Sequence, residues 1–363
     1  MRIGILTFHD CTNYGALFQA YALRKIVGRL SDAQTEIIDY KNPRITERLQ
    51  IEDVMKDRSF KGFVRRMISV PYRRKKNELF EEFLNMNGML SKRSYDKDTI
   101  GECTEQYDIL LFGSDQIWNL TLNGKDSTYF GAFASNARKI AYAPSTGGSD
   151  LSESTEEIEK WLKGFSALST RENRDKMLIK QRFGLDAEQV LDPTFLLERE
   201  EWIELEEPYV VPERYILLYL ISPEKEDFVQ AKKLGDLTGL PVLYVAYSYR
   251  CEAGVKNLRA VSPGQFIYLL NHAEYVVTNS FHGMALSINL NKDFYCQLPA
   301  RKKQSNCRAA EILERLNLKG RILQDGEEIV PEHMIECQEV ETRLNDMRNM
   351  SKEYLRKALI KHP

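Results

Sequence analysis

The sequence predicts an α/β protein built of two lobes, and three observations support this fold class. Short apolar, β-branched segments alternate with helical segments along most of the chain. Several of these apolar segments end in polar, glycine-containing turns, as strands of an open parallel sheet do before a helix. The chain has 363 residues, which is too long for one ordinary hydrophobic core. We therefore expect two Rossmann-like lobes that face each other across a cleft, with a closing C-terminal helix.

The first lobe is expected to span residues 1–200. Its apolar pattern predicts strands at 3–8, 37–40, 107–112 and 139–143, a strand-to-turn segment at 167–172, and helices at 16–30, 154–163 and 174–183. Residues 43–94 are expected to form a helical, charged insertion with a basic cluster at Arg65, Arg66 and 73–76. A solvated face is the ordinary interpretation of such a run, and an anionic lipid or membrane surface is the binding alternative.

The second lobe is expected to span residues 210–335, after an acidic stretch at 198–213. Its pattern predicts strands at 215–220, 241–246, 275–278 and 293–296, with helices at 223–238, 263–271 and 284–290. A polar, basic loop at 300–308 precedes a further helix, and an apolar stripe at 338–361 predicts an amphipathic C-terminal helix.

Composition excludes several functional classes. The net charge of −2 argues against a general nucleic-acid-binding protein, and no apolar run approaches the length of a membrane span. The N-terminus lacks a signal-peptide pattern, and the six cysteines are scattered without a CxxC pair. We therefore expect a cytoplasmic protein that uses neither a metal nor a cofactor.

The turn at 279–283 is the strongest candidate site in the second lobe, because it joins a predicted strand to a predicted helix. The amides at such a helix start can hold an anion. Gly283 would let a ligand approach the backbone closely, and His282 could exchange a proton near neutral pH. The alternative is that His282 caps the helix by bonding to the backbone.

Two turns of the first lobe carry further candidates. Asp115 could bind a sugar hydroxyl or accept its proton, and Trp118 offers a flat face for a sugar ring. The alternative for Asp115 is a helix cap. Arg171 could grip a carboxylate or phosphate with two parallel hydrogen bonds, or form a surface salt bridge with Glu172.

Two loops could also meet an anionic ligand. The segment 9–15 precedes a helix and could hold a phosphate or carboxylate, or could be a purely structural turn. It lacks a GxGxxG fingerprint, so the signal for a dinucleotide is weak. The basic loop at 300–308 could deliver positive charge through Arg308, or could simply be solvated.

Five motifs together resemble the polysaccharide pyruvyl transferase family. They are Asn13-Tyr14-Gly15-Ala16, Gly113-Ser114-Asp115-Gln116-Ile117-Trp118-Asn119, Ser169-Thr170-Arg171-Glu172, Leu191-Asp192-Pro193-Thr194 and Ser280-Phe281-His282-Gly283. The resemblance runs in order over most of the chain. It implies a GT-B-like fold and a cytoplasmic transferase of bacterial exopolysaccharide and cell-envelope biosynthesis, at work near the inner face of the membrane. The implied reaction moves the pyruvyl group of phosphoenolpyruvate onto two hydroxyls of a sugar or lipid-linked oligosaccharide, giving a ketal and phosphate.

The resemblance also implies roles for individual residues. It implies catalytic roles for His282 and Asp115 and a donor-binding role for Arg171. Together with the local patterns, it leads us to expect that Ser280, Gly283, Asn306 and Arg308 also bind the donor. The residues expected to bind the acceptor are Asn13, Tyr14, Gly15, Ser114, Gln116 and Trp118. Better-studied members have arginine where this chain has Ser280. Arg308, or the segment 301–303, could supply that cation; otherwise the donor differs.

Two other functions fit the same sequence features. A GT-B glycosyltransferase would bind a nucleotide sugar and need no phosphoenolpyruvate. A non-catalytic family member would bind saccharide, and its function would survive replacement of His282.

Overall fold

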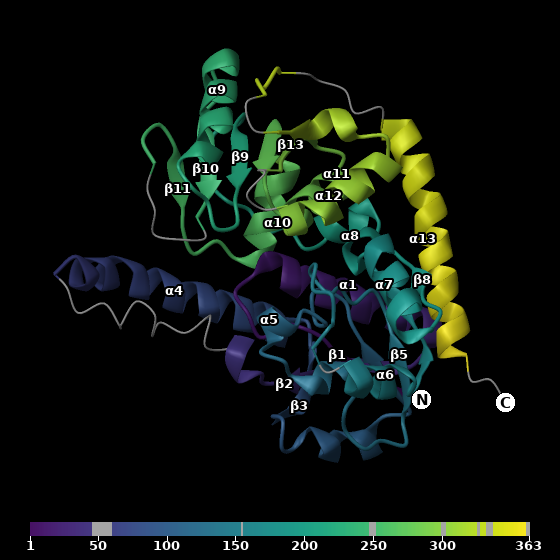
Figure 1. Ribbon diagram of the computed structural model, residues 1–363. Helices are drawn as coiled ribbons and strands as arrows, with labels where there is room; N and C mark the ends of the chain where they lie inside the picture. Colours follow the sequence, from purple (N-terminus) through teal and green to yellow (C-terminus); the bar gives the residue numbers. More distant parts are fainter. Residues whose placement is uncertain are drawn as a thin grey trace. The chain divides into compact units, whose positions relative to one another are not determined.

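The computed structural model describes residues 1–45, 60–153, 155–246, 252–298, 303–324, 327–331 and 337–360, with side chains described outside 60–69, 303–306 and 337. The chain divides into two compact units. Unit 1 comprises Met1–Gln50, Leu84–Leu197 and Asn345–Pro363, and unit 2 comprises Ile51–Phe83 and Glu198–Leu344. Each unit contains a β-sheet of its own with helices packed around it (Figure 1).

The sheet of unit 1 has six parallel strands in the order β3-β2-β1-β4-β5-β6. These strands are β1 (Arg2–Leu6), β2 (Gln34–Tyr40), β3 (Leu90–Tyr95), β4 (Ile109–Phe112), β5 (Arg138–Ala141) and β6 (Phe165–Ala167). This is the strand order of a dinucleotide-binding fold, with its switch point between β1 and β4. Loops that follow these two strands are therefore the natural place for a ligand site.

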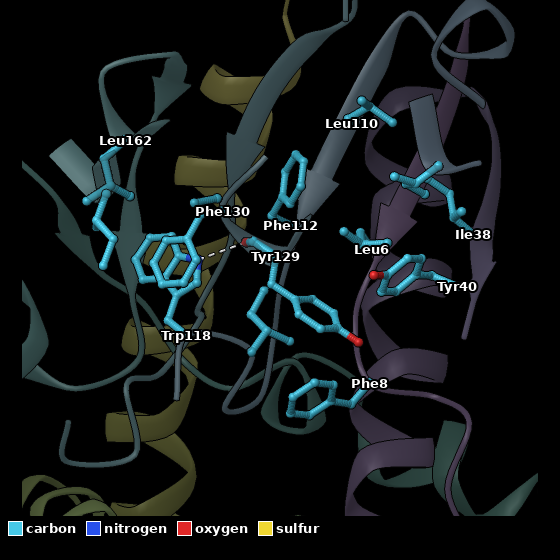
Figure 2. Packing of buried hydrophobic residues seen from close by; sticks show 14 of the residues in the cluster. Leu6, Phe8, Ile38, Tyr40, Leu110, Phe112, Trp118, Tyr129, Phe130 and Leu162 are labelled. Carbon is cyan, nitrogen blue, oxygen red and sulfur yellow. Dashed lines mark hydrogen bonds between the residues drawn. The ribbon is translucent and has the colours of Figure 1, made fainter. Parts of the chain in front are cut away.

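Helices and a small second sheet complete unit 1. They are α1 (Tyr14–Ser31), η1 (Ile100–Gln106), α5 (Leu120–Asn123), η2 (Ser127–Phe130), α6 (Thr155–Leu162), α7 (Asn173–Phe183) and η3 (Pro193–Phe195), with the strand pair β7 (Ser169–Thr170) and β8 (Glu188–Gln189). Buried side chains from β1, β2 and β4, among them Leu6, Ile38, Leu110 and Phe112, form the core shown in Figure 2. Burial of such apolar area is the main stabilising contribution to the unit.

The sheet of unit 2 repeats the same arrangement, in the order β11-β10-β9-β12-β13-β14. Its parallel strands are β9 (Ile216–Tyr219), β10 (Val242–Val245), β11 (Lys256–Leu258), β12 (Tyr275–Thr278), β13 (Asp293–Gln297) and β14 (Ile322–Leu323). The helices are α8 (Arg199–Ile203), η4 (Glu226–Phe228), α9 (Val229–Thr238), α10 (Pro263–Asn271), α11 (Phe281–Asn289), α12 (Lys303–Arg315) and η6 (Lys319–Arg321). The switch point of this sheet lies between β9 and β12.

The C-terminal helix α13 (Cys337–Leu359) is fastened to unit 1 through its second half. The Arg348 Nε donates to the carbonyl of Phe195 at 2.6 Å, and the Tyr354 hydroxyl donates to the carbonyl of Ala141 at 2.8 Å. These side-chain bonds to buried backbone carbonyls hold the helix against unit 1. No helix among the described residues is long and apolar enough to cross a membrane.

The structure confirms the predicted α/β class with two Rossmann-like lobes, and it corrects two elements. Residues 90–94 were expected to be helical but lie in the edge strand β3, whose middle residues are exposed. The helix of the insertion is α4 (Phe60–Met86), most of which groups with unit 2. Residues 303–308 were expected in a loop but lie in α12.

Candidate functional site

The predicted site residues fall into two groups, one in each unit. The group in unit 1 surrounds Arg171, just after β7. Its Nη1 lies 2.6 Å from Asp192, its Nε lies 3.0 Å from Glu172, and its Nη2 lies 3.9 Å from Asp115. The side chain is only 4% exposed. Arg171 is therefore a buried counter-ion of three carboxylates, and the expected surface salt bridge with Glu172 is in fact a buried one.

The three carboxylates keep Arg171 charged. Burial alone would lower the pKa of Arg171, but Glu172, Asp192 and Asp115 outweigh that effect and raise it above its ordinary value. An anionic ligand at Arg171 would meet these same carboxylates. A ligand that binds Arg171 must therefore contact the guanidinium while the carboxylates stay bonded to it.

Asp115 is held by its backbone at the switch point of unit 1. It has a positive φ of 65°, and its carbonyl accepts a 2.8 Å hydrogen bond from the Ser145 amide. The preceding Gly113 also has a positive φ, and a Cβ there would lie 1.9 Å from the Tyr142 carbonyl oxygen. The cap alternative for Asp115 is wrong, because Asn119 caps α5. The Asp115 carboxylate is thus placed at the edge of the Arg171 group.

Ser114 belongs to the same network. Its carbonyl accepts a hydrogen bond from the Thr7 hydroxyl at 3.2 Å, and its own hydroxyl donates to Asp192 at 3.3 Å. These bonds join the ends of β1 and β4 and reach the carboxylate that holds Arg171. Ser114 is fully buried, so its side chain serves this network.

Trp118 has no face available for a sugar ring, which corrects the expectation. The ring is fully buried and stacks on Phe130, with ring centroids 5.6 Å apart (Figure 2). Its indole N–H donates to the carbonyl of Tyr129 at 3.0 Å. Gln116 is half-buried, and its side-chain carbonyl accepts from Asn119 at 3.0 Å. A sequence pattern cannot distinguish a stacking tryptophan from a core tryptophan at the same spacing.

The segment that starts α1 is built as a helix cap. The Asn13 side chain accepts hydrogen bonds from the amides of Gly15 and Ala16 at 2.8 and 3.3 Å. Tyr14 is buried and stacks on Phe18. These contacts agree with the structural-turn interpretation, because the amides at the helix start already have a side-chain acceptor.

A cluster of His9, Asp39, Ser94 and Lys41 beside this segment was not predicted from the sequence. His9 Nε2 lies 3.0 Å from Asp39, and its Nδ1 lies 3.1 Å from the Thr7 carbonyl. Burial would raise the pKa of Asp39, but hydrogen bonds from His9, Ser94 and Lys41 hold that pKa well below its usual range. The cluster fixes the loop after β1. Its members lie far apart in the sequence, so only the pairing of β2 with β1 and β3 reveals it.

The group in unit 2 surrounds the start of α11. The Ser280 side chain is the N-cap and accepts from the Gly283 amide at 3.3 Å, so His282 is not the cap. His282 is 9% exposed and meets Phe281 edge-on, with ring centroids 5.2 Å apart. A Cβ on Gly283 would lie 2.5 Å from the Thr278 hydroxyl. Gly283 is therefore needed for packing between helix and strand.

Arg308 reaches the same helix start from α12. Its guanidinium carbon lies 6.0 Å from the centroid of the Phe281 ring, at the outer limit of a cation–π contact. Phe281 thus has both His282 and Arg308 as neighbours. Arg301 lies outside the described residues, and Asn306 lies on α12 with its side chain outside the described ones.

This second group lies at the switch point of the sheet in unit 2. Asn279 joins the ends of β12 and β9, because its side chain accepts from the Ile221 amide at 2.7 Å and donates to the Ile221 carbonyl at 3.3 Å. An imidazole, a guanidinium and the N-terminus of α11 therefore occur together there. Such a set can bind an anion and move a proton. No group of three or more potential metal ligands occurs among the described residues.

Comparisons with known proteins agree with this architecture. UDP-GlcNAc 2-epimerase from Methanocaldococcus jannaschii, in complex with UDP-GlcNAc and UDP, superposes with a TM-score of 0.51 at 12% identity, over 96% of this chain and 93% of that one. The same enzyme from Neisseria meningitidis, bound to UDP-GlcNAc, gives 0.51 at 10% identity, over 99% and 95%. These likenesses confirm a GT-B-like fold. No curated protein matches the sequence significantly.

The family itself is identified by sequence. The sequence model described as polysaccharide pyruvyl transferase matches residues 13–296, which is well over half of the chain. The match includes every motif named above, together with Arg171 and His282. The protein belongs to the polysaccharide pyruvyl transferase family.

Proposed function

We propose that this protein transfers the pyruvyl group of phosphoenolpyruvate onto two hydroxyls of a sugar in a cell-surface polysaccharide precursor. The observation that carries the proposal is the neighbourhood of Phe281 at the start of α11, where the Phe281 ring has Arg308 of α12 in one contact and His282 in another. The family resemblance leads us to expect an arginine where this chain has Ser280. We propose that Arg308, whose guanidinium lies at the ring of the next residue, Phe281, supplies the cation for the donor instead.

The donor demands this kind of site. Phosphoenolpyruvate carries a phosphate and a carboxylate, and guanidinium groups bind both through charge-assisted hydrogen bonds. Amides at the N-terminus of α11 add partial positive charge. In this scheme Ser280 shapes the helix start as its cap, and Gly283 keeps α11 close to β12.

The proposed reaction balances without a cofactor. Two bonds form between the sugar oxygens and the central carbon of the enol, and the bond from that carbon to the phosphate oxygen breaks. One hydroxyl proton is balanced by the proton that turns the methylene into a methyl group, and the other leaves with phosphate. His282 is the proposed acid for the methylene carbon.

Unit 1 is the proposed acceptor side. Asp115 lies at the switch point and is the proposed base or hydrogen-bond acceptor for a sugar hydroxyl. Arg171 would add positive charge for the donor while it stays bonded to Glu172 and Asp192. Because Trp118 and Tyr14 are buried, the acceptor would be held by polar groups around Asp115 and Gln116 rather than by those rings.

We also propose that the acceptor is lipid-linked and that the protein works in the cytoplasm at the membrane surface. Residues 60–77 contain seven Lys and Arg residues and no Asp or Glu. Because the whole chain has a formal charge of −2, the remainder carries −9. A helical segment so different in charge from the rest of the chain supports attraction to anionic lipid headgroups.

Titration calorimetry with phosphoenolpyruvate tests the donor assignment. We expect the wild type to bind phosphoenolpyruvate and Arg308→Ala to bind it about tenfold or more weakly, because one charge-assisted contact contributes about 1.5–3 kcal/mol. Arg308→Lys should recover part of the affinity, since it keeps the charge but loses the planar fork.

Lys319→Ala is the matched control. Lys319 is an exposed cation of the same unit, and it pairs with Glu314 on the surface. Its replacement should leave the affinity unchanged. Equal affinity in the wild type and Arg308→Ala would remove Arg308 from the donor site. Binding of a UDP or GDP sugar in place of phosphoenolpyruvate would establish the glycosyltransferase alternative.

A further inference from the structure

A further buried carboxyl group, that of Asp175, follows Arg171 in the sequence. Asp175, in the first turn of α7, is 1% exposed. Both of its oxygens accept hydrogen bonds from Thr146, one from the amide and one from the hydroxyl, each at 2.7 Å. Thr146 stands in the loop that follows β5. Asp175 therefore ties α7 to the loop at the carboxyl end of that strand.

Glu172 is the neighbour of Asp175 on the other side. One of its oxygens, Oε1, accepts from Arg171 Nε at 3.0 Å. The other, Oε2, is buried and receives no N–H or O–H hydrogen bond from the described part of the chain. Glu172 is the N-cap of α7 and Asp175 lies in its first turn, where the Asp175 amide donates to the Glu172 carbonyl at 3.2 Å. Two carboxyl groups can form a hydrogen bond with each other only if one of them carries a proton.

The surrounding charges favour the protonated form of Asp175. Burial and the negative charge of Glu172 raise the pKa of Asp175 to about 7, against the smaller opposite effect of the Thr146 bonds. Arg174 is the nearest cation, with Nη1 3.7 Å from Asp175, but its side chain is 48% exposed and its Nη2 donates to the Gly148 carbonyl.

The buried cation of this region, Arg171, is engaged by other carboxylates. Arg171 already balances Asp192 and Glu172 and lies near Asp115. With one buried guanidinium among these carboxylates, a further ionised carboxylate at position 175 would lack a buried counter-ion of its own.

We propose that Asp175 is protonated at neutral pH and donates to Glu172 Oε2, and that this carboxyl pair positions both the Arg171 side chain and the loop after β5. With the proton in place, Asp175 donates to Glu172 Oε2, and Glu172 keeps its orientation toward Arg171. Loss of the proton puts two negative charges side by side, which drives Glu172 away from Asp175 and disturbs Arg171. Only the consequence for ligand binding rests on the proposed function.

The pH dependence of thermal stability tests the proton on Asp175. An unperturbed aspartate has a pKa of about 3.9, so the folded protein binds more protons than the unfolded chain between about pH 4 and 7. This group therefore destabilises the wild type progressively as the pH rises through that range. In Asp175→Asn the amide donates to Glu172 at every pH. We expect the Tm of the wild type to fall relative to Asp175→Asn by about 4 °C or more between about pH 5 and 8.

Two further variants keep the test decisive. Asp186→Asn, which changes a surface carboxylate just beyond α7, should give a profile parallel to that of the wild type. Glu172→Gln removes the neighbouring charge and offers an amide that donates to ionised Asp175, so it should weaken the same pH dependence even if Asp175→Asn does not fold. Profiles of Asp175→Asn or Glu172→Gln that run parallel to the wild type would overturn the proposal.

Binding of phosphoenolpyruvate over the same pH range separates this inference from the proposed function. A phosphate ester gains charge above about pH 6, which by itself favours a cationic site more at high pH. We expect the affinity of the wild type to fall relative to that of Asp175→Asn as the pH rises through 7. A pH-dependent difference in Tm without any phosphoenolpyruvate binding would defeat the proposed function and leave the carboxyl pair standing.

Discussion

The buried guanidinium of Arg171 organises unit 1 at the scale of single residues. Asp115, Glu172 and Asp192 come from three separate segments, and each approaches the guanidinium. A buried ion pair of this kind adds little net stability, because desolvation offsets most of the attraction. The ion pairs instead serve to orient the side chains and the segments that carry them. The arrangement fixes the ends of three segments relative to one another, where a carboxylate and a cation are available for chemistry.

Gly283 gives the most direct prediction at this scale. A Cβ at position 283 would lie 2.5 Å from Thr278 Oγ1 and 2.9 Å from Tyr219 Cδ1. Gly283→Ala should therefore push α11 away from the sheet and destabilise the protein by about 1–3 kcal/mol. Urea unfolding measures this loss.

Gly101→Ala is the control for that substitution. Gly101 has no heavy atom within 4 Å of the position of a Cβ, and its φ is not positive. Its replacement should be neutral or slightly stabilising. Equal stability of the Gly283→Ala variant and the wild type would mean that Gly283 is not required for packing, and the expectation of close approach by a ligand would return.

Sequence reasoning identified residue types but not their surroundings. The segment around Asp115 and the turn before His282 do lie at the switch points of their sheets, because a strand followed by a polar turn can be recognised locally. Burial cannot be recognised in this way. Trp118 and Tyr14 have the chemistry of sugar contacts, yet both are core residues. The contacts of Asp175 with Thr146 and of His9 with Asp39 depend on pairing between distant segments.

At the scale of elements, apolar periodicity identified most of the long helices and the central strands. It failed at the edges of the sheets. The strand β3 carries Lys92 and Arg93 on exposed positions, so its sequence looks like a continuation of the charged helix before it. The strands β11 and β14 contain three and two residues, too few for a periodic signal. The start of α12 was placed too late because its first turns are polar.

The helix α4 carries the prediction that belongs to this scale. Arg73, Arg74, Lys75 and Lys76 lie on it close to the exposed Tyr72. We expect the protein to sediment with vesicles that contain phosphatidylglycerol at low salt and not with pure phosphatidylcholine. Each basic residue near an anionic surface contributes about 1 kcal/mol, so replacing all four by glutamine should weaken binding by about 100-fold or more.

A triple variant of α13 is the matched control. Arg343, Arg356 and Lys357 each pair with an acidic residue of their own helix. Their replacement by glutamine removes cations without touching α4, and vesicle binding should persist. Undiminished vesicle binding by the α4 variant would rule out this helix as the membrane contact.

At the scale of the whole molecule, the two units use one topology twice. Both sheets have the strand order of a dinucleotide-binding fold, and in each unit one candidate residue, Asp115 or His282, follows a central strand. The chain passes between the units four times, so neither unit is one continuous segment. The family match covers residues from both units. Asp115 and Arg171 belong to one unit, and His282 and Arg308 belong to the other.

The most direct test of the central claim follows the pyruvyl group itself. The purified protein would be incubated with phosphoenolpyruvate labelled in its pyruvyl carbons and with a lipid-linked oligosaccharide extract, beside labelled UDP and GDP sugars. We predict that label from phosphoenolpyruvate enters the glycan with release of one phosphate per group transferred. His282→Ala should lower the rate about tenfold or more, which corresponds to about 1.4 kcal/mol of barrier. Transfer of label from a nucleotide sugar, with none from phosphoenolpyruvate, would contradict the assignment of donor and reaction.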